Sequence, residues 1–302
     1  MSDAWAIDTQ QLTKRYGTLD AVRSLDLKVA RHGITGFLGR NGAGKSTTIK
    51  MLLGMTRPTS GSGTIVNRRI DHPRESLEAR RRVAYVAEDK QTYAYMTVEQ
   101  MIRFTRSFYT DWQPDLERRL LDELGLPPRR KVKALSKGMR TKLALLLALA
   151  RRPELLILDE PSEGLDPVSI EELLQTLVAT AAEGTTIFFS SHQIAEVERI
   201  ADRVCIIDHG QLVADLSLDD MRQEYRRITL GFTSEPPVAD FHMPGVEHVR
   251  TSGRQMDVFV TRNAAAVVER ARRAAVVSLD VTPLTLRDVF LETVQHSLRE
   301  TA

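Results

Sequence analysis

A glycine-rich stretch, GRNGAGKS at residues 39–46, constrains the fold of this chain more than any other segment. It follows the apolar run GITGFLG (33–39) and opens a segment, 44–55, in which apolar residues recur at helical spacing. The order strand, G-x-x-x-x-G-K-S, helix is typical of a loop whose backbone N–H groups turn inward around phosphate oxygens. The N-terminus of the helix adds the positive end of its dipole. The sequence therefore predicts a phosphate site between a strand and a helix.

The side chains of this loop predict its contacts. Lys45 can reach the β- and γ-phosphates of a nucleotide, and the hydroxyl of Ser46 can ligate Mg²⁺. A flexible glycine turn with an incidental lysine is the alternative, but it does not account for strand, glycines, lysine and serine in this order. We expect nucleotide contacts from Gly39, Arg40, Asn41, Gly42, Ala43, Gly44, Lys45, Ser46 and Thr47.

Two later apolar runs end in polar residues suited to the same site. LLILDEP (155–161) contains Asp159 and Glu160, and TTIFFSS (185–191) is followed by His192. An unpaired carboxylate is costly to bury, so we expect Asp159 to hold Mg²⁺ and Glu160 to act on the attacking water. His192 follows a strand at the edge where ligands of α/β sheets bind, and could donate a hydrogen bond to the γ-phosphate. Solvated acids and a packed histidine are the ordinary alternatives.

The arrangement of apolar segments predicts an α/β fold. Continuous runs such as 155–161 and 185–191 are expected for strands buried on both faces of a parallel sheet. A helical subdomain is expected over about 92–135 within a first domain, 1–215. After residue 215 a charged helix (215–227), a segment rich in turn formers (228–245), and then strand, helix, strand and helix predict a small α+β domain over 216–302.

Composition narrows the class of protein. The net charge of +2 gives no strong argument for a nucleic-acid partner, and the sequence pI of about 8.7 leaves weak binding to an anionic surface open. The single cysteine, Cys205, cannot form a disulfide within the chain and suits a reducing cytoplasm. The N-terminal residues lack the pattern of a secretory signal, and the longest apolar run, LALLLALA, is far short of the roughly 20 residues that cross a bilayer. We therefore expect no membrane span.

The stretch LSKGMR (135–140) indicates a second anion site. It directly precedes an apolar helical run, so Ser136 is a plausible helix N-cap and the N–H groups after it can bind an anion. Spacing leaves open whether this site and the glycine loop meet one phosphate within a single chain.

Taken together, the motifs from Leu12 to about Asp215 resemble the ATP-binding cassette (ABC) family of transporter ATPases. LSKGMR is similar to the signature motif of that family, and SEGLD (162–166) is similar to its D-loop, with Asp166 as the characteristic acid. YVAED falls where the family carries its Q-loop, and Tyr16 stands where an aromatic ring stacks on adenine.

The resemblance implies a P-loop cassette with ATP and Mg²⁺ as cofactors, Glu160 and Lys45 as catalytic residues and His192 as the switch histidine. It also implies a second ATPase chain, because the signature of one subunit closes over ATP bound to the glycine loop of the other. Signature residues Ser136, Lys137 and Gly138 would then contact a partner's nucleotide.

Three departures from the family pattern bear on these roles. Lys137 replaces the usual glycine and Met139 the usual glutamine of the signature; the ammonium could strengthen contact with phosphate or point to solvent. Glu88 replaces the Q-loop glutamine; its carboxylate can still ligate Mg²⁺ or water but cannot donate a hydrogen bond. Arg40 replaces a frequent proline. The resemblance implies that hydrolysis is retained.

Within the family, the single cassette and the C-terminal TLRDVFLETV resemble ATPase subunits of bacterial exporters whose membrane domain is a separate polypeptide. This implies a homodimer, or a heterodimer with a sister ATPase, at the cytoplasmic face of the cell membrane. The helical stretch from Thr92 to Leu135 would receive the membrane subunits, with TYAYMTVEQM (92–101) either in that contact or forming an ordinary core edge.

Two rival interpretations fit less well. A soluble ABC ATPase acting on ribosomes or DNA usually carries two cassettes or a long coiled coil, and neither pattern occurs here. A P-loop kinase leaves the signature and SEGLD unexplained.

Overall fold

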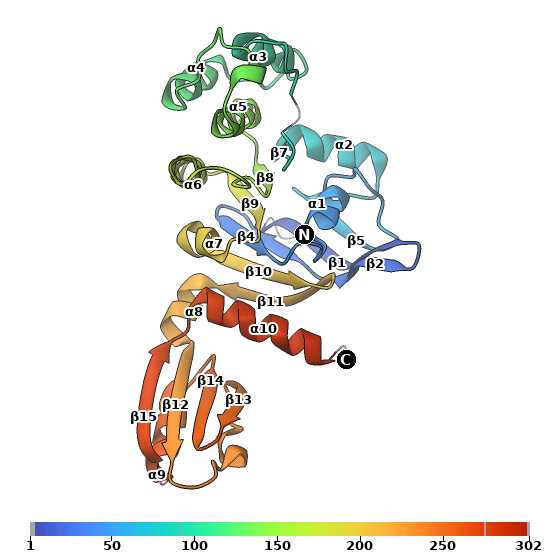
Figure 1. Ribbon diagram of the computed structural model, residues 1–302. Helices are drawn as coiled ribbons and strands as arrows, with labels where there is room; N and C mark the ends of the chain where they lie inside the picture. The colour runs from blue at the N-terminus through green and yellow to red at the C-terminus, as the bar shows by residue number, and fades with distance from the viewer. Residues whose placement is uncertain (1–3, 91, 275, 301–302) are drawn as a thin grey trace. The chain divides into compact units, whose positions relative to one another are not determined.

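The computed structural model describes residues 4–90, 92–274 and 276–300 (Figure 1). The chain divides into two compact units, Met1–Asp215 and Leu216–Ala302. None of the helices among the described residues combines the length and apolar character needed to span a bilayer.

The first unit is built on a six-stranded sheet of order β11-β10-β4-β9-β8-β7. Every residue of its strands β4, β8 and β9 is buried, and the pairs β4–β9 and β8–β9 are parallel, which confirms the prediction from the continuous apolar runs. Parallel pairing brings the carboxyl ends of these strands to one edge. The strands are β4 (Ile34–Leu38), β7 (Val83–Val86), β8 (Leu155–Asp159), β9 (Thr186–Ser191), β10 (Arg203–Asp208) and β11 (Gln211–Ser217).

A second sheet of the first unit is antiparallel, with order β2-β1-β5-β6 and β3 paired to β1. The sequence analysis missed it, because the apolar alternation of β1 is interrupted. Register shifts interrupt its pairing with β2 and with β5, and Gln11, with φ of 49°, lies within the shift in the β5 pairing. The strands are β1 (Trp5–Tyr16), β2 (Leu19–Leu25), β3 (Lys28–Ala30), β5 (Ser60–Ile65) and β6 (Arg68–Arg69).

Helix α1 (Lys45–Leu52) lies in the core between the two sheets. Its Ile49, Met51 and Leu52 belong to one cluster with residues of both sheets, among them Ile7 and Phe188. The helix ends earlier than the expected residue 55, since Gly54 takes a φ of 65°. Three further helices of this unit are α2 (Pro73–Arg82), α6 (Pro167–Ala182) and α7 (Ile194–Ile200).

A helical segment follows β7 and is drawn in green in Figure 1. A reciprocal capping box of Thr97 and Gln100 starts its first helix, and Leu116 and Leu120 are buried on one face of its second. The segment comprises α3 (Val98–Arg106), α4 (Pro114–Glu123), the 3₁₀ turn η1 (Val132–Ala134) and α5 (Lys137–Leu149).

The second unit contains an antiparallel sheet of order β13-β14-β12-β15. The sequence analysis expected a charged helix over 215–227 and turns over 228–245; instead α8 is short and a strand, β12, begins at Arg226. Alternate residues Ile228, Leu230 and Phe232 are buried in the core that α9 covers. The elements are α8 (Leu218–Glu224), β12 (Arg226–Phe232), η2 (Val238–Phe241), β13 (Val246–Ser252), β14 (Gln255–Val260), α9 (Ala264–Arg273), β15 (Val276–Pro283) and α10 (Leu286–Glu300).

Candidate functional site

The glycine loop joins β4 to α1 and holds Lys45 inside it. The Lys45 ammonium donates hydrogen bonds to the carbonyls of Gly39, at 2.7 Å, and Arg40, at 3.3 Å, and the residue is only 5 % exposed. Gly44 has a φ of 111°, and a Cβ there would lie 2.6 Å from the Ala21 carbonyl oxygen. Glycine is therefore required at this position for the loop to close against the β2 strand.

The side of the glycine loop that faces away from β2 is open around Gly42. Gly42 has a φ of 83°, and no atom of the described residues lies within 4 Å of the position that its Cβ would take. Arg40, Asn41 and Gly42 are exposed, while Ser46 and Thr47 are half-buried at the start of α1. An open cradle of N–H groups at a helix N-terminus with a buried lysine fits nucleotide phosphates.

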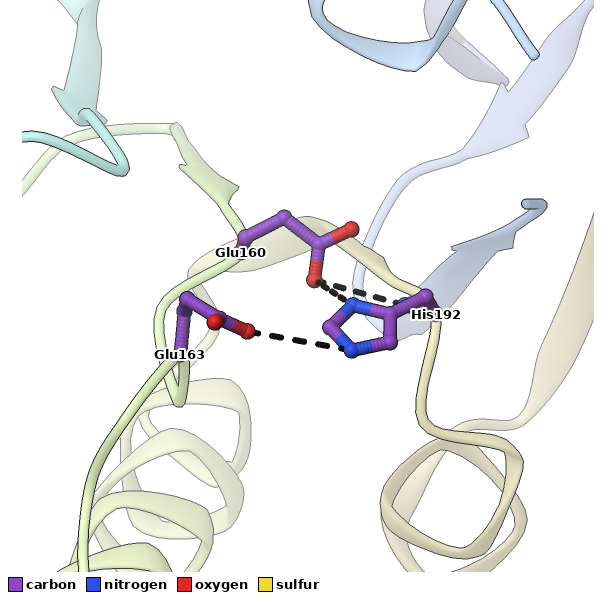
Figure 2. Close-up of side chains that lie close together, drawn as sticks. All are labelled: Glu160, Glu163 and His192. Atoms are coloured by element: carbon purple, nitrogen blue, oxygen red, sulfur yellow. Dashed lines mark hydrogen bonds and ion pairs between the residues drawn. The ribbon is translucent and has the colours of Figure 1, made fainter. Parts of the chain in front are cut away.

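Glu160 connects the glycine loop to His192. Its Oε1 lies 3.0 Å from Nζ of Lys45, and its Oε2 lies 2.9 Å from Nδ1 of His192 (Figure 2). The backbone N–H of His192 also donates to Oε2, at 3.3 Å. Glu160 is 6 % exposed, so its charge is compensated by these partners rather than by water.

The backbone of Glu160 is unusual. Its φ of 45° is in the left-handed region, which costs a residue with a side chain about 1 kcal/mol. The N–H of Glu160 donates to the Ser190 hydroxyl at 3.0 Å, and this bond together with the Lys45 contact holds the conformation. Such strain persists where surrounding contacts determine the geometry, and it concentrates at functional sites.

Ser190 is a site residue that the sequence analysis did not identify. It lies opposite Asp159 in the pairing of β8 with β9, and its hydroxyl donates to Oδ1 of Asp159 at 2.6 Å. Asp159 is 3 % exposed. Burial and, next, the negative charge of Asp159 raise the pKa of Tyr85 to about 12. The signal in the sequence was the pair of serines that ends an otherwise apolar strand.

Glu163 is a second residue that was missed. Its carboxylate points toward the His192 ring from the side opposite Glu160, with 3.7 Å between Oε2 and Nε2 (Figure 2). One potential ligand atom from each of Glu160, Glu163 and His192 lies within 4.8 Å of the others, a spacing that could hold a metal ion. Glu163 occurs within SEGLD, three residues after Glu160 in one tight turn. Its spacing from Glu160 was the available clue.

The signature and D-loop residues form a second cluster. The Ser136 hydroxyl caps α5 by accepting from the N–H of Met139 at 3.1 Å, as expected for an N-cap. A Cβ on Gly138 would lie 2.4 Å from Oγ of Ser169, which in turn donates to Oδ2 of Asp166 at 2.7 Å. The Ser169 hydrogen bond is the main reason that the pKa of Asp166 is lowered. Asp166 is thus the N-cap of α6, packed beside the signature.

Lys137 lies against the D-loop of its own chain. A Cβ on Gly164 would come within 2.3 Å of Nζ of Lys137 and 3.3 Å of its Cε. The positive charge of Lys137 also contributes, after burial, to lowering the pKa of Lys90. The lysine in the signature therefore extends along the loop that contains Glu163, rather than directly away from the protein.

The remaining predicted residues are on the periphery. Tyr16, at the end of β1, is 49 % exposed, and Nζ of Lys14 lies 4.9 Å from its ring centroid. Glu88 follows β7 in an exposed bend, where its carbonyl accepts from Nζ of Lys90 at 3.3 Å. The exposed face of Tyr16 is available for stacking. The carboxylate of Glu88, like those of the other acids, is a hard oxygen ligand of the kind that Mg²⁺ prefers.

Comparison with known proteins identifies the family. The family model for ABC transporters matches residues 22–163. Over 224 residues the chain is 38 % identical to the bacitracin transport ATP-binding protein BcrA of Bacillus licheniformis, covering 73 % of this chain and 72 % of that protein. It is 34 % identical over 238 residues to BcrA of Enterococcus faecalis, covering 78 % and 77 %.

A solved structure agrees with these relatives. The ATP-binding subunit of an ABC transporter superposes with a TM-score of 0.65 at 33 % identity, over 72 % of this chain and 92 % of that one. The fold, the glycine loop with its acidic strand end, and these similarities lead to one conclusion: the chain belongs to the ABC transporter family, as an ATP-binding subunit with ATPase activity.

Proposed function

We propose that this chain is the ATPase of an exporter whose membrane-spanning part is a separate polypeptide. The observation that carries the hydrolytic part is the buried Glu160, held between Lys45 and His192 beside the glycine loop. Export is supported by the two relatives named as bacitracin transport ATP-binding proteins. Peripheral attachment at the cytoplasmic face of the membrane follows from this role.

ATP with Mg²⁺ fits the residues present. The N–H groups of residues 39–47 would surround the phosphates, and Tyr16 would stack on the adenine. The hydroxyl of Ser46 and the carboxylates of Asp159 and Glu88 would hold Mg²⁺, which when bound neutralises developing charge on the phosphates.

The side chains of this chain then act in order. Lys45 leaves Glu160 to contact the phosphates, because a phosphate oxygen is a stronger partner for an ammonium than a carboxylate already bonded to histidine. Glu160 is then free to accept a proton from the attacking water, at its Oε1. His192 keeps its bond to Oε2, which orients the carboxylate and leaves Nε2 able to face the γ-phosphate.

A second ATPase chain completes the site. Ser136, Lys137, Gly138 and Asp166 form a cluster of their own around α5 and α6, and we assign this cluster to the γ-phosphate of ATP bound by a partner. One chain thus contributes two half-sites, in a homodimer or with a sister subunit. Because both chains bind the γ-phosphate, its loss on hydrolysis changes the relative stability of closed and open dimers.

We assign residues 1–215 to ATP binding and residues 216–302 to an accessory domain. The helical region, about 92–135, is the surface for the membrane subunits. It carries a groove of about 610 Å³ whose lining residues are Tyr95, Met96, Thr97, Gln100, Arg103, Phe104 and Lys131. Tyr95 is 67 % exposed, and Tyr93 and Phe108 extend the aromatic surface. An exposed patch of this kind marks a protein contact.

A soluble ABC ATPase that acts on ribosomes or DNA is the alternative. The aromatic groove and the named transport relatives favour a membrane partner, and the near-balanced charge of +2 gives no reason to expect nucleic acid.

Size-exclusion chromatography with light scattering on Glu160→Gln, at low chain concentration, tests this proposal. We expect ATP with Mg²⁺ to convert monomer to dimer, and Ser136→Arg in the same background to abolish the shift. Ser217→Arg, at an N-cap far along the chain from the signature, is a matched control and should leave the shift in place. A chain that stays monomeric with ATP would exclude a homodimer that forms by itself, and leave either a sister ATPase subunit or a pair that the membrane subunits hold together.

A further inference from the structure

Glu196 is a buried carboxyl group that the proposed mechanism does not use. It lies on α7 and is 6 % exposed, and its Oε2 accepts a hydrogen bond from the hydroxyl of Ser162 at 2.6 Å. Ser162 is itself 1 % exposed. Burial raises the pKa of Glu196, the bond from Ser162 opposes this, and the negative charge of Glu160 adds to it. A carboxyl group at this position costs stability, so stability alone does not account for it.

Ser162 belongs to the tight turn that begins at Glu160. The N–H of Glu163 donates to the Glu160 carbonyl at 3.2 Å. Within this turn the Glu163 carboxylate points toward His192 (Figure 2). The Ser162 side chain is buried instead, and bonded to Glu196. The bond at Ser162 therefore restrains the backbone two residues after Glu160.

Helix α7 gives Glu196 a fixed base. A Cβ on Gly36 in β4 would lie 2.4 Å from Cγ1 of Val197, and Val197 is fully buried, so the helix packs directly on that strand. Strand β4 lies between β10 and β9 and is parallel to both. Through Ser162 and Glu196 the turn at Glu160 is therefore tied to a strand inside the sheet.

The backbone at Glu160 needs contacts of this kind. Its φ of 45° persists only where neighbouring contacts determine the conformation. In the free chain its N–H donates to the Ser190 hydroxyl, and its Oε1 is paired with Lys45. In the proposed mechanism Lys45 moves to the phosphates, so this pair is absent at the step in which Glu160 acts on the water. The bond between Ser162 and Glu196 does not involve Lys45 and would be retained.

We propose that Glu196 is a positioning residue for ATP hydrolysis, which acts through Ser162 to keep Glu160 aligned with the attacking water after Lys45 has moved to the phosphates. This inference rests on the role given to Glu160 in the proposed function. It concerns the chemical step, because the glycine loop would bind the phosphates whether or not Glu160 is aligned. Loss of the bond should therefore lower the turnover number, kcat, and leave the affinity for ATP unchanged.

Glu196→Met tests this role, because it keeps a side chain of similar length and replaces the carboxylate by a thioether, which is a weak acceptor. We expect kcat for phosphate release to fall about tenfold, the factor that one hydrogen bond to a charged group can contribute. Equilibrium binding of a fluorescent ATP analogue should be unchanged. Glu235→Met, at an exposed glutamate of the second unit, is the matched control and should change neither value. A normal kcat in Glu196→Met, or a fall in kcat matched by weaker ATP binding, overturns the proposal.

Two further variants separate this hydrogen bond from a general loss of packing. Glu196→Gln should retain most of the turnover, because its amide oxygen can accept from Ser162. Ser162→Ala should lower kcat as Glu196→Met does, and it remains informative if the methionine variant folds poorly. Equal kcat in the glutamine and methionine variants would contradict a role that depends on this acceptor.

A double variant tests the path through Ser162. Ser162→Ala/Glu196→Met should be no slower than either single variant, because both substitutions remove the same bond. Losses that multiply would mean that the two side chains act independently, and the link to Glu160 would be wrong. Thermal unfolding of the same series identifies a purely structural role: variants that lose Tm but keep the wild-type kcat refute the positioning.

The outcome is separable from the role of Glu160 itself. Near-normal turnover in Glu160→Gln would overturn the proposed function, and with it the need to position that carboxylate. An inactive Glu160→Gln beside fully active Glu196→Met and Ser162→Ala would overturn the positioning role alone. In the Glu160→Gln background, Glu196→Met should still dimerise with ATP, because nucleotide binding does not require an aligned base. A lost dimer there would place Glu196 in binding and contradict the proposal.

Discussion

The ammonium of Lys45 lies 3.0 Å from Oε1 of Glu160, so the cation assigned to the phosphates is bound to the carboxylate assigned to the water. Both side chains are nearly inaccessible to solvent. In the proposed mechanism the two charges neutralise each other until a nucleotide enters, and transfer of Lys45 to the phosphates releases Glu160 to act on the water.

Removing the charge at position 160 separates binding from hydrolysis. We expect Glu160→Gln to lower turnover by about 10²- to 10⁴-fold, the usual contribution of a general base. Its ATP affinity should be equal to that of the wild type or higher, because Lys45 no longer has to leave a carboxylate. Steady-state phosphate release and equilibrium binding of a fluorescent ATP analogue measure the two effects. Near-normal turnover would refute the assigned role.

Removing Lys45 should weaken both binding and stability. Lys45→Ala leaves the buried Glu160 carboxylate without its ammonium partner, and breaking a buried pair costs about 3 kcal/mol or more. Thermal unfolding should show a lower Tm, and ATP binding should be largely lost.

The double variant Lys45→Ala/Glu160→Gln separates these causes. It should recover most of the Tm, because no unpaired carboxylate remains, and should still fail to bind ATP. If the double variant is as unstable as Lys45→Ala, the ion pair is not the source of the loss.

Lys137 should contribute to ATP-driven association. A hydrogen bond to a charged group contributes about 1.5 kcal/mol, so Lys137→Ala in the Glu160→Gln background should raise the ATP concentration for half-maximal dimerisation about tenfold. Lys133→Ala, an exposed lysine just before the signature, is the control. If both variants behave like their parent, the Lys137 ammonium makes no contact with phosphate.

Glu196 should make stability depend on pH. Burial raises its pKa above the ordinary value of 4.5, and the charge of Glu160 adds to this, against the hydrogen bond from Ser162. The folded chain therefore binds this proton more tightly than the unfolded chain, and the resulting stability is lost as pH rises from about 4.5 through the raised pKa.

Glu196→Gln should remove that loss. Its Tm should exceed that of the wild type at pH 8, with a smaller difference near pH 5, in differential scanning calorimetry. Glu235→Gln, at an exposed site, should show no such trend. A Tm difference that does not change with pH would assign the effect to packing.

The aromatic groove should affect transport without affecting the isolated ATPase. Tyr95→Ala removes an exposed ring from the groove and should reduce ATP-dependent transport in vesicles that contain the membrane subunits. ATP hydrolysis by the free chain should be unchanged. Leu77→Ala, at a half-exposed residue on α2, is the control, and equal transport in both variants would exclude the groove.

Sequence patterns predicted the parts of the fold in which the local composition of a segment matches its burial, above all the buried parallel strands. The runs at 155–161 and 185–191 are apolar throughout because parallel strands are covered on both faces, and their polar ends necessarily come to one sheet edge. The β1 strand could not be predicted in this way, since its bulges break the period of two. In the second unit, Gly231 within ITLGF and the turn formers after it made the alternation of apolar and polar residues in β12 hard to recognise from the sequence.

The sequence indicated which residues belong to the candidate site, but not which of them contact one another. Lys45, Glu160 and His192 are recognisable from motifs, but their direct contacts depend on side-chain directions that a motif does not give. The left-handed φ of Glu160 is a backbone feature that the sequence does not reveal either. Ser190 and Glu163 were missed because a serine in a strand and an acid in a turn are common, and their roles appear only across strands or loops.

The absence of a side chain at position 138 has a consequence for how the two nucleotides of the proposed dimer are connected. Gly138 and Ser169 lie so close together that even a methyl group at position 138 would collide with Oγ of Ser169, so α5 and α6 pack in direct contact at this point. In the proposed dimer, α5 begins at the nucleotide bound by the partner chain. Helix α6 follows the loop 162–166, which comes shortly after Glu160 at the nucleotide bound by the same chain. If the dimer forms as proposed, this contact would connect the two nucleotides within each chain, and a larger residue at position 138 would separate the helices that connect them.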